Sequence, residues 1–309
     1  MAILGALARA RPRWVHAAAL PVLTMSVSIV LSGQTVGRIS PIAAQLRETT
    51  LTVVDPTRYT ISHGRVLSKV RHLPTLLIRP LTPGPHPVVI FCHGYDITPL
   101  AYLHLLRHWA SAGFVVAAPY FPLTNAHAGR WLDENDIVNQ PKDASAVLTA
   151  TERSLGAAVD LRHVFVAGHS DGGATSFGAG FATAVRDPRW TGVLVFSGDR
   201  RTGMGSFAPA SRAVPFMLVQ SDHDEYNSVA EASKVWAVPR APKTYLHLYG
   251  ARHLPPFSAA CTYRDIVEAT TTDFLRAWST SDAGRRQAAR QQLERDAVHR
   301  GLSGVTDAV

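Results

Sequence analysis

Three polar residues occur in an order that could support nucleophilic catalysis. Ser170 lies in the segment GHSDG (168–172), which has the form G-x-S-x-G, and it precedes Asp224 and His253 in the chain. A serine hydroxyl is a weak nucleophile, so it needs a histidine base and an acid that orients this histidine. A nucleophile on a strand-to-helix turn is followed along the chain by its acid and then by its histidine. We therefore predict acyl transfer with Ser170 as nucleophile, Asp224 as acid and His253 as base.

The surroundings of Ser170 are more specific than the pattern itself. The apolar run HVFVAG (163–168) precedes the serine and predicts a buried strand, and a run of small residues after it predicts a helix. A sharp turn between strand and helix needs glycine on both sides so that the two backbones can pass. The helix N-terminus then points at the negative charge that develops during acyl transfer.

The acid and the base each have a rival. The loop after the predicted strand 214–220 contains three carboxylates, Asp222, Asp224 and Glu225. We prefer Asp224 because it lies a few residues beyond the strand, where it can turn inward, and Asp222 is the second choice. For the base, His247 lies inside a predicted strand, whereas His253 follows the end of that strand.

The oxyanion of an acyl-transfer intermediate needs backbone N–H donors. The N–H of Asp171, directly after the nucleophile, is the first candidate. The second is the N–H of Tyr95, because Gly94 before it lets the backbone approach a substrate. Donors of this kind contribute about 3–4 kcal/mol each in related enzymes. An ordinary turn at the end of a strand is the alternative interpretation of residues 93–94, and the motif around Ser170 favours the oxyanion loop.

These residues need a scaffold, and apolar runs alternate with amphipathic segments from about residue 70 onward. Short continuous apolar strands separated by helices indicate a mostly parallel sheet with helices on both faces, so we predict a doubly wound α/β domain. The predicted strands are 72–79, 87–92, 113–118, 163–168, 191–196, 214–220 and 244–249. The predicted helices are 99–112, 143–155, one after Ser170, 229–236 and 265–278. The long loop 125–139 is predicted either to line a substrate cleft or to be a solvated acidic loop.

The two ends of the chain differ from this domain. Arginines at positions 9, 11 and 13 precede an apolar run over 15–32, and no acidic residue occurs before Glu48. This layout predicts a signal peptide, or alternatively an uncleaved N-terminal anchor, over residues 1–35, and therefore a secreted or cell-envelope protein. We assign 36–280 to the catalytic domain. The polar, arginine-rich residues 281–309 are predicted to form a helical tail, with a surface helix and a loose end.

Composition narrows the class of protein. The 309 residues are 46% hydrophobic and 17% charged, which is typical of a globular protein. The net charge of +8 is spread out, so it predicts no nucleic-acid site. We prefer to interpret it as an ordinary solvated basic surface, and adsorption to anionic surfaces such as membranes is the alternative. Cys92 and Cys261 could form a disulfide in an exported protein or stay free, and no zinc pattern occurs. We expect a monomer without cofactor or metal.

Several segments together resemble a known group of enzymes. They are PVVIFCHGYD (87–96), LRHWASAGFVVAAPYFP (106–122), NQPKDASAVL (139–148), AGHSDGG (167–173), GARHLPPF (250–257) and TTTDFLRAW (270–278). The chain resembles, over about residues 70–278, the secreted α/β-hydrolases that include chlorophyllase-like, platelet-activating-factor-acetylhydrolase-like and bacterial polyester-hydrolase-like esterases. The resemblance implies the α/β-hydrolase fold and a catalytic set that matches the one predicted above, namely Ser170, Asp224 and His253 with the N–H groups of Tyr95 and Asp171.

Two positions depart from the polyester hydrolases of this group. Those enzymes usually carry a tryptophan just after the strand that follows the nucleophile helix, where this chain has Ser197 and Gly198. Trp190 precedes that strand and is a poor substitute. Asp171 stands where methionine is common, next to the predicted oxyanion site. Both differences weaken a polymer-degrading function and leave an esterase function intact.

The sequence thus predicts a serine esterase that cleaves a small-molecule or lipid-like carboxylic ester through an acyl-enzyme. A peptidase or amidase that uses the same three residues is the first alternative. A non-catalytic binding protein of the same fold is the second.

Overall fold

The computed structural model describes residues 45–298 and 301–308, which belong to one compact unit of the chain. The predicted signal peptide or anchor at residues 1–35 lies outside the described residues. Within the described part, no helix combines the length and the apolar character that crossing a membrane requires. The predicted boundaries at residues 36–280 and 281–309 stay a prediction.

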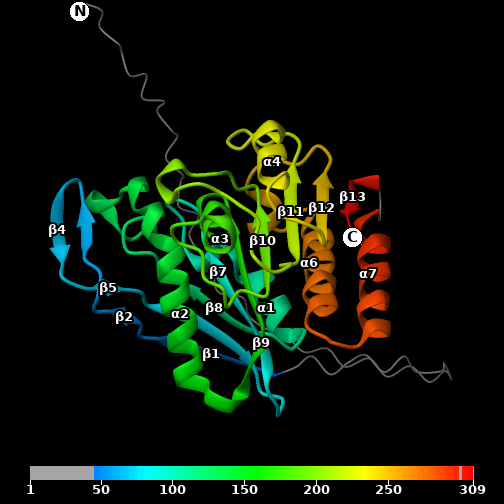
Figure 1. Cartoon of the computed structure of the whole chain (residues 1–309), viewed down its shortest axis with the longest axis horizontal. Helices are drawn as coiled ribbons and strands as arrows, with labels where there is room; N and C mark the ends of the chain where they lie inside the picture. The colour runs from blue at the N-terminus through cyan, green and yellow to red at the C-terminus, as the bar shows by residue number, and fades with distance from the viewer. Residues whose placement is uncertain (1–44, 299–300, 309) are drawn as a thin grey trace, which may run out of the picture. The chain divides into compact units, whose positions relative to one another are not determined.

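The centre of the fold is one nine-stranded sheet (Figure 1). Its strands are β1 (Leu46–Leu51), β6 (Thr75–Pro80), β7 (His86–Cys92), β8 (Val115–Pro119), β9 (Val159–His169), β10 (Gly192–Phe196), β11 (Phe216–Ser221), β12 (Lys243–Leu248) and β13 (Ser303–Ala308). Across the sheet they follow the order β1-β6-β8-β7-β9-β10-β11-β12-β13. The strands between β8 and β12 in this order pair in parallel, and β1, β6 and β13 pair antiparallel.

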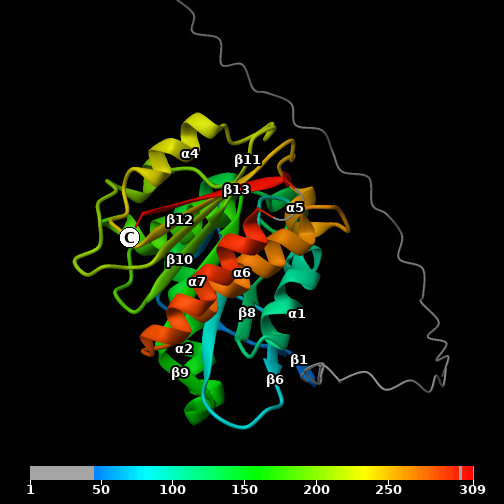
Figure 2. The ribbon, with the colours of Figure 1, turned by 90° about the vertical axis from the view of Figure 1, so that its right-hand side faces the viewer.

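Helices cover both faces of this sheet, as Figures 1 and 2 show. The helices are α1 (Leu103–Ser111), α2 (Gln140–Leu155), α3 (Asp171–Phe181), α4 (Val229–Trp236), α5 (Pro255–Ser258), α6 (Arg264–Trp278) and α7 (Ala283–Ala297). One apolar core joins the sheet to α2, α3 and α4, and a second joins it to α1, α6 and α7. The predicted fold class, an α/β-hydrolase fold with a mostly parallel sheet, is confirmed.

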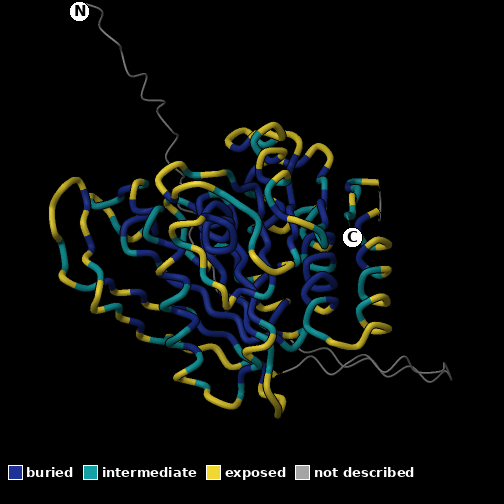
Figure 3. Tube along the Cα trace, in the orientation of Figure 1, coloured by how far each residue is buried: buried dark blue, intermediate teal, exposed yellow. Residues whose placement is uncertain are grey.

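Strand β7 illustrates why these segments could be predicted. Val88, Ile90 and Cys92 belong to the first core, and Val89 and Phe91 belong to the second. All five side chains are fully buried, and Figure 3 shows the central strands buried. A parallel strand with both faces covered must be apolar throughout, and this gives the continuous hydrophobic runs of the sequence.

The edge strand β1 and four short strands near the N-terminus were not predicted. β2 (Val54–Asp55) pairs with β5 (Arg71–His72), and β3 (Thr60–Ser62) pairs with β4 (Arg65–Ser68). They form two separate two-stranded sheets beside the main one. Such short strands contain too few residues for a hydrophobic alternation to be recognised.

The C-terminal tail corrects one expectation. The predicted surface helix is α7, but the loose end expected after it is wrong for residues 303–308. These residues form β13, which pairs antiparallel with β12 and extends the sheet, with Val305 opposite Leu246. The strand contains Gly304 and the polar Asp307, and because such residues are depleted from strands, its composition does not predict a strand.

The two cysteines are both free. Cys92 lies in the middle of the sheet, where burial raises the pKa of its thiol to about 12. A thiol that stays protonated in an apolar core is chemically inert, so Cys92 is a packing residue.

Helices α6 and α7 share a pair of carboxyl groups whose ionisation should affect stability. Burial, together with a hydrogen bond and the charge of Asp296, raises the pKa of Asp273 from its ordinary 3.8 to about 7. Because the folded protein then holds a proton that the unfolded chain releases, the free energy of unfolding falls as the pH rises from about 4 to about 7.

We therefore expect Asp273→Asn to raise the free energy of unfolding by about 2 kcal/mol at about pH 8 and to have little effect at about pH 4. The amide cannot ionise and can still donate a hydrogen bond to Asp296. Urea unfolding of wild type and variant across this pH range measures the difference. A stabilisation that does not change with pH would contradict the prediction.

Candidate active site

Ser170 lies at the turn between β9 and α3 in a backbone conformation that few non-glycine residues adopt. Its φ is 58° and its ψ is −121°. The neighbouring glycines are sterically required, since a Cβ at Gly168 would overlap the carbonyl of Gly172, and one at Gly172 would overlap the carbonyl of Cys92. Strained residues of this kind cluster at functional sites because the surrounding structure must hold them. The half-buried hydroxyl stands just before the N-terminus of α3, as the motif predicts.

Asp224 and His253 form a close pair on the loops after β11 and β12. His253 Nδ1 lies 2.9 Å from Oδ1 and 2.8 Å from Oδ2 of Asp224, and both side chains are buried. The carboxylate also accepts hydrogen bonds from the backbone N–H groups of Tyr226 (2.9 Å) and Asn227 (2.8 Å). Burial alone would raise the pKa of Asp224, but these partners hold the pKa below its ordinary value. A carboxylate that stays ionised in contact with Nδ1 orients the imidazole and stabilises its protonated form.

The rival residues lie elsewhere. Asp222 Oδ1 accepts a hydrogen bond of 2.6 Å from the backbone N–H of Gly250, so this side chain joins the two loops. His247 lies in β12, with its ring stacked on Tyr245 at a centroid distance of 3.8 Å. The structure therefore brings Asp224, and not Asp222, to His253.

His169 connects the serine turn to the histidine loop. Its Nε2 lies 2.9 Å from the backbone carbonyl oxygen of His253, and the two rings are 4.6 Å apart. Its Nδ1 lies 2.9 Å from the hydroxyl of Tyr102. Burial keeps the pKa of His169 well below its ordinary value. A neutral ring with these partners donates from Nε2 to the carbonyl and accepts the Tyr102 proton at Nδ1.

The same chain of hydrogen bonds reaches the predicted oxyanion loop. The Tyr102 hydroxyl accepts a hydrogen bond from the N–H of Gly94 (3.2 Å), and His93 Nδ1 lies 2.7 Å from the carbonyl oxygen of Gly94. Hydrogen bonds thus fix both the N–H and the carbonyl oxygen of Gly94. A Cβ at Gly94 would lie 3.2 Å from the Cβ of Ser170, which puts the loop directly beside the serine. Tyr95, the predicted donor, is the next residue and is half-buried.

An arginine that the sequence analysis missed compensates the carboxylate of Asp171. Asp171 is 2% exposed, and its Oδ1 accepts a hydrogen bond of 2.6 Å from Arg201. The same guanidinium lies 3.2 Å from Glu134 and 3.0 Å from Asp199. Burial would lower the pKa of Arg201, but the three carboxylates raise the pKa above its ordinary value. The Asp171 carboxylate beside the predicted oxyanion site is therefore paired with the Arg201 guanidinium.

The position of the missing tryptophan is filled by a tightly held turn. Ser197 has a φ of 45° and is buried, and its carbonyl oxygen accepts a hydrogen bond of 2.5 Å from the Asn227 side chain. Trp190 is 1% exposed and belongs to the core that α2, α3 and α4 share with the sheet. Neither residue presents a flat aromatic surface at the site.

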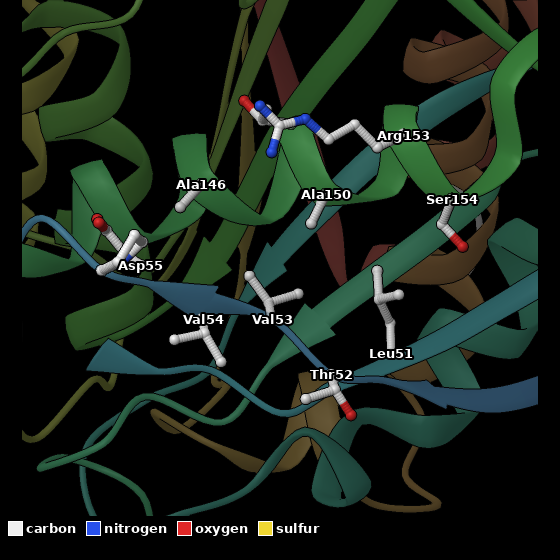
Figure 4. Close-up of a pocket in the computed structure, with 11 residues that line it drawn as sticks. Leu51, Thr52, Val53, Val54, Asp55, Ala146, Ala150, Arg153 and Ser154 are labelled. Carbon is white, nitrogen blue, oxygen red and sulfur yellow. The ribbon is translucent and has the colours of Figure 1, made fainter. Parts of the chain in front are cut away.

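A separate groove is lined by other residues than these. Figure 4 shows that it lies between residues 51–56 and α2, and its volume is about 530 Å³. Its lining combines aliphatic side chains with Asp55 and Arg153, and none of Ser170, Asp224 and His253 takes part. Within the described part of the chain, no cluster of three or more His, Cys, Asp or Glu residues is arranged to hold a metal ion.

The family model named Chlorophyllase matches residues 49–196, which include the predicted oxyanion loop and the serine turn but end before Asp224 and His253. A search of the curated proteins found no match.

Proposed function

We propose that this chain, whose residues 49–196 match the chlorophyllase family of α/β-hydrolase esterases, hydrolyses carboxylic esters through a triad of Ser170, His253 and Asp224. The observation that carries the proposal is the buried Asp224–His253 pair, with Nδ1 and Oδ2 2.8 Å apart. The hydrogen bond from His169, the residue before Ser170, to the His253 carbonyl supports it further.

The reaction then proceeds in two halves. His253 Nε2 takes the proton of the Ser170 hydroxyl while the serine oxygen attacks the ester carbonyl, and the protonated ring gives that proton to the departing alcohol. A water molecule, deprotonated by the same histidine, attacks the acyl-enzyme, and the ring then gives this proton to the Ser170 oxygen as the acid is released. The N–H groups of Tyr95 and Asp171 hold the oxyanion in both halves, and Asp224 stays ionised throughout.

We expect a small-molecule or lipid-like ester as substrate and no cofactor. The turn at Ser197 and Gly198 offers no aromatic surface, so the site suits single esters better than an aromatic polymer. Export to the cell envelope, or retention there by an anchor, stays a prediction from residues 1–35.

Active-site titration tests the proposal directly. A p-nitrophenyl phosphonate should label the protein once per chain, on the peptide that contains Ser170, and should abolish hydrolysis of p-nitrophenyl esters in proportion. Varying the acyl length of these esters then measures the size of the acyl pocket. A chain that neither labels nor hydrolyses any ester would favour the alternative of a binding protein. Labelling at another serine would refute the assignment of Ser170.

The pairing of Asp171 with Arg201 makes a separate prediction. We expect Arg201→Met to lower kcat about tenfold, because it leaves a buried negative charge next to the oxyanion, at a cost of about 1–3 kcal/mol. The double variant Arg201→Met/Asp171→Asn should recover most of this loss, since the charge is removed and the backbone donor is kept. Arg200→Met, at an exposed neighbouring position, is the matched control. A double variant no better than Arg201→Met would contradict the electrostatic explanation.

A further inference from the structure

In the small sheet of β3 and β4, polar side chains point inward and apolar side chains point to the solvent. Thr60 and Ser62 point inward, where their hydroxyls donate to the carbonyl oxygens of Val70 (2.9 Å) and Trp131 (3.1 Å). Ile61, between them, is 47% exposed. A strand with one covered face normally shows the opposite pattern, with apolar side chains inside and polar ones in water. Apolar surface that is left outward in this way indicates an interaction site.

Other apolar and aromatic side chains extend this surface. Val66 is paired with Ile61 across the two strands and is 51% exposed, and Tyr59 is 52% exposed. The half-buried ring of Trp131 lies under two guanidinium groups, those of Arg65 (5.4 Å from the ring centroid) and Arg130 (4.7 Å). We call these six residues the hairpin patch: Tyr59, Ile61, Arg65, Val66, Arg130 and Trp131. The hairpin stands at the outer edge of the fold in Figure 1, and Figure 3 shows it mostly exposed.

The charge around the hairpin patch is mostly basic. No aspartate or glutamate occurs from residue 56 to residue 95, and Lys69 and His63 add basic groups on the exposed surface. Asp133, two residues after Trp131, is buried and accepts a hydrogen bond of 3.1 Å from the backbone N–H of His63, and Glu134 after it is paired with Arg201. The patch is therefore apolar at its centre and basic at its border.

We propose that the hairpin patch docks the protein on an anionic lipid surface. Ile61, Val66 and Tyr59 enter the headgroup region, and the arginines contact lipid phosphates. Aromatic, aliphatic and basic side chains together are what membrane interfaces select, and each basic residue near such a surface contributes attraction. A stable protein partner would need about 800 Å² from each side, which is more than a few side chains on a short hairpin supply.

The hairpin is joined by direct contacts to the rim of the proposed catalytic site. Trp131 holds Ser62 through its carbonyl, and Glu134, three residues later, lies 3.2 Å from Arg201. Arg201 binds Asp171, the residue after the serine. Docking at the hairpin patch would thus bring a membrane-borne ester near Ser170. This consequence rests on the proposed function, whereas docking itself does not.

A fluorescent label at the patch tests the docking without depending on what residues 1–44 do. In the full chain, Cys261→Ser removes the accessible thiol, Cys92 stays buried, and Ile61→Cys receives an environment-sensitive dye. Vesicles that contain phosphatidylglycerol should shift the dye emission to the blue, and phosphatidylcholine alone should not. High salt should weaken the shift, because it screens the attraction. The same dye at Leu161→Cys, an exposed position at the start of β9, is the control and should not respond.

Charge variants complete the test. Arg65→Gln/Arg130→Gln should weaken vesicle binding about fivefold per charge and leave hydrolysis of a soluble p-nitrophenyl ester unchanged. The proposal is wrong if the chain sediments with the vesicles while the dye at position 61 stays in water. It is equally wrong if the dye shifts with protein concentration alone, since a second copy would then cover the patch. If the chain does not dock on the vesicles but hydrolyses esters normally, the docking proposal is wrong and the proposed function is unaffected.

Discussion

Asp224→Asn should lower kcat for ester hydrolysis by about 10⁴-fold, as loss of the acid does in other serine triads. An asparagine at this position can donate its amide hydrogen to His253 Nδ1, which now faces the carboxylate at 2.8–2.9 Å. The ring would then carry its proton on Nε2, the atom that must accept the proton of Ser170. The loss therefore comes from the wrong tautomer rather than from a misplaced ring. Steady-state rates on a p-nitrophenyl ester measure it.

Asp222→Asn is the matched control, because it changes the rival acid in the same loop. Its side-chain oxygen can still accept the hydrogen bond from Gly250, so the activity should stay near that of wild type. The double variant Ser170→Ala/Asp224→Asn should be no slower than Ser170→Ala alone, since residues that act as a unit are not additive. A large loss in Asp222→Asn with little loss in Asp224→Asn would reverse the assignment of the acid.

The sequence predicted best those features that depend on local backbone geometry or on burial. Continuous apolar runs identify the parallel strands because both faces of these strands are covered. The glycines at 168 and 172 mark the serine turn because a side chain there would overlap backbone atoms. Chain order, together with the predicted ends of strands 214–220 and 244–249, then indicated where the acid and the histidine follow.

Contacts between segments that are far apart in the sequence have no such local sequence pattern. Arg201 reaches Asp171 across thirty positions of the chain, and nothing in its own neighbourhood indicates this partner. His169 was only the variable position of the motif, although it contacts Tyr102 and the carbonyl of His253. The edge strand β13 was missed because its pairing with β12, and not its own composition, makes it a strand. Such contacts follow from the topology, which a single sequence does not display.

Arg71 makes a second prediction of large effect, on stability. Its side chain is fully buried in β5 and donates to Asp136 (2.9 and 2.7 Å) and to Asp143 (2.8 and 2.6 Å). Arg58 adds a further hydrogen bond of 2.6 Å to Asp143. These contacts join the N-terminal segment to α2 and to the residues just before it. A guanidinium suits this role because its planar fork binds two carboxylates at once.

We expect Arg71→Met to lower the free energy of unfolding by about 3–5 kcal/mol at neutral pH, because two buried carboxylates lose their principal cation. Burial already raises the pKa of Asp136, and without the arginine this pKa should rise further. The folded variant can then bind a proton on Asp136, so its deficit in stability should shrink as the pH falls. Urea unfolding at several pH values measures this. Arg162→Met is the control, since that exposed arginine pairs with Asp160 at the surface and should change stability much less than Arg71→Met. A similar small effect for both variants would mean that the buried cluster contributes no more than a surface ion pair.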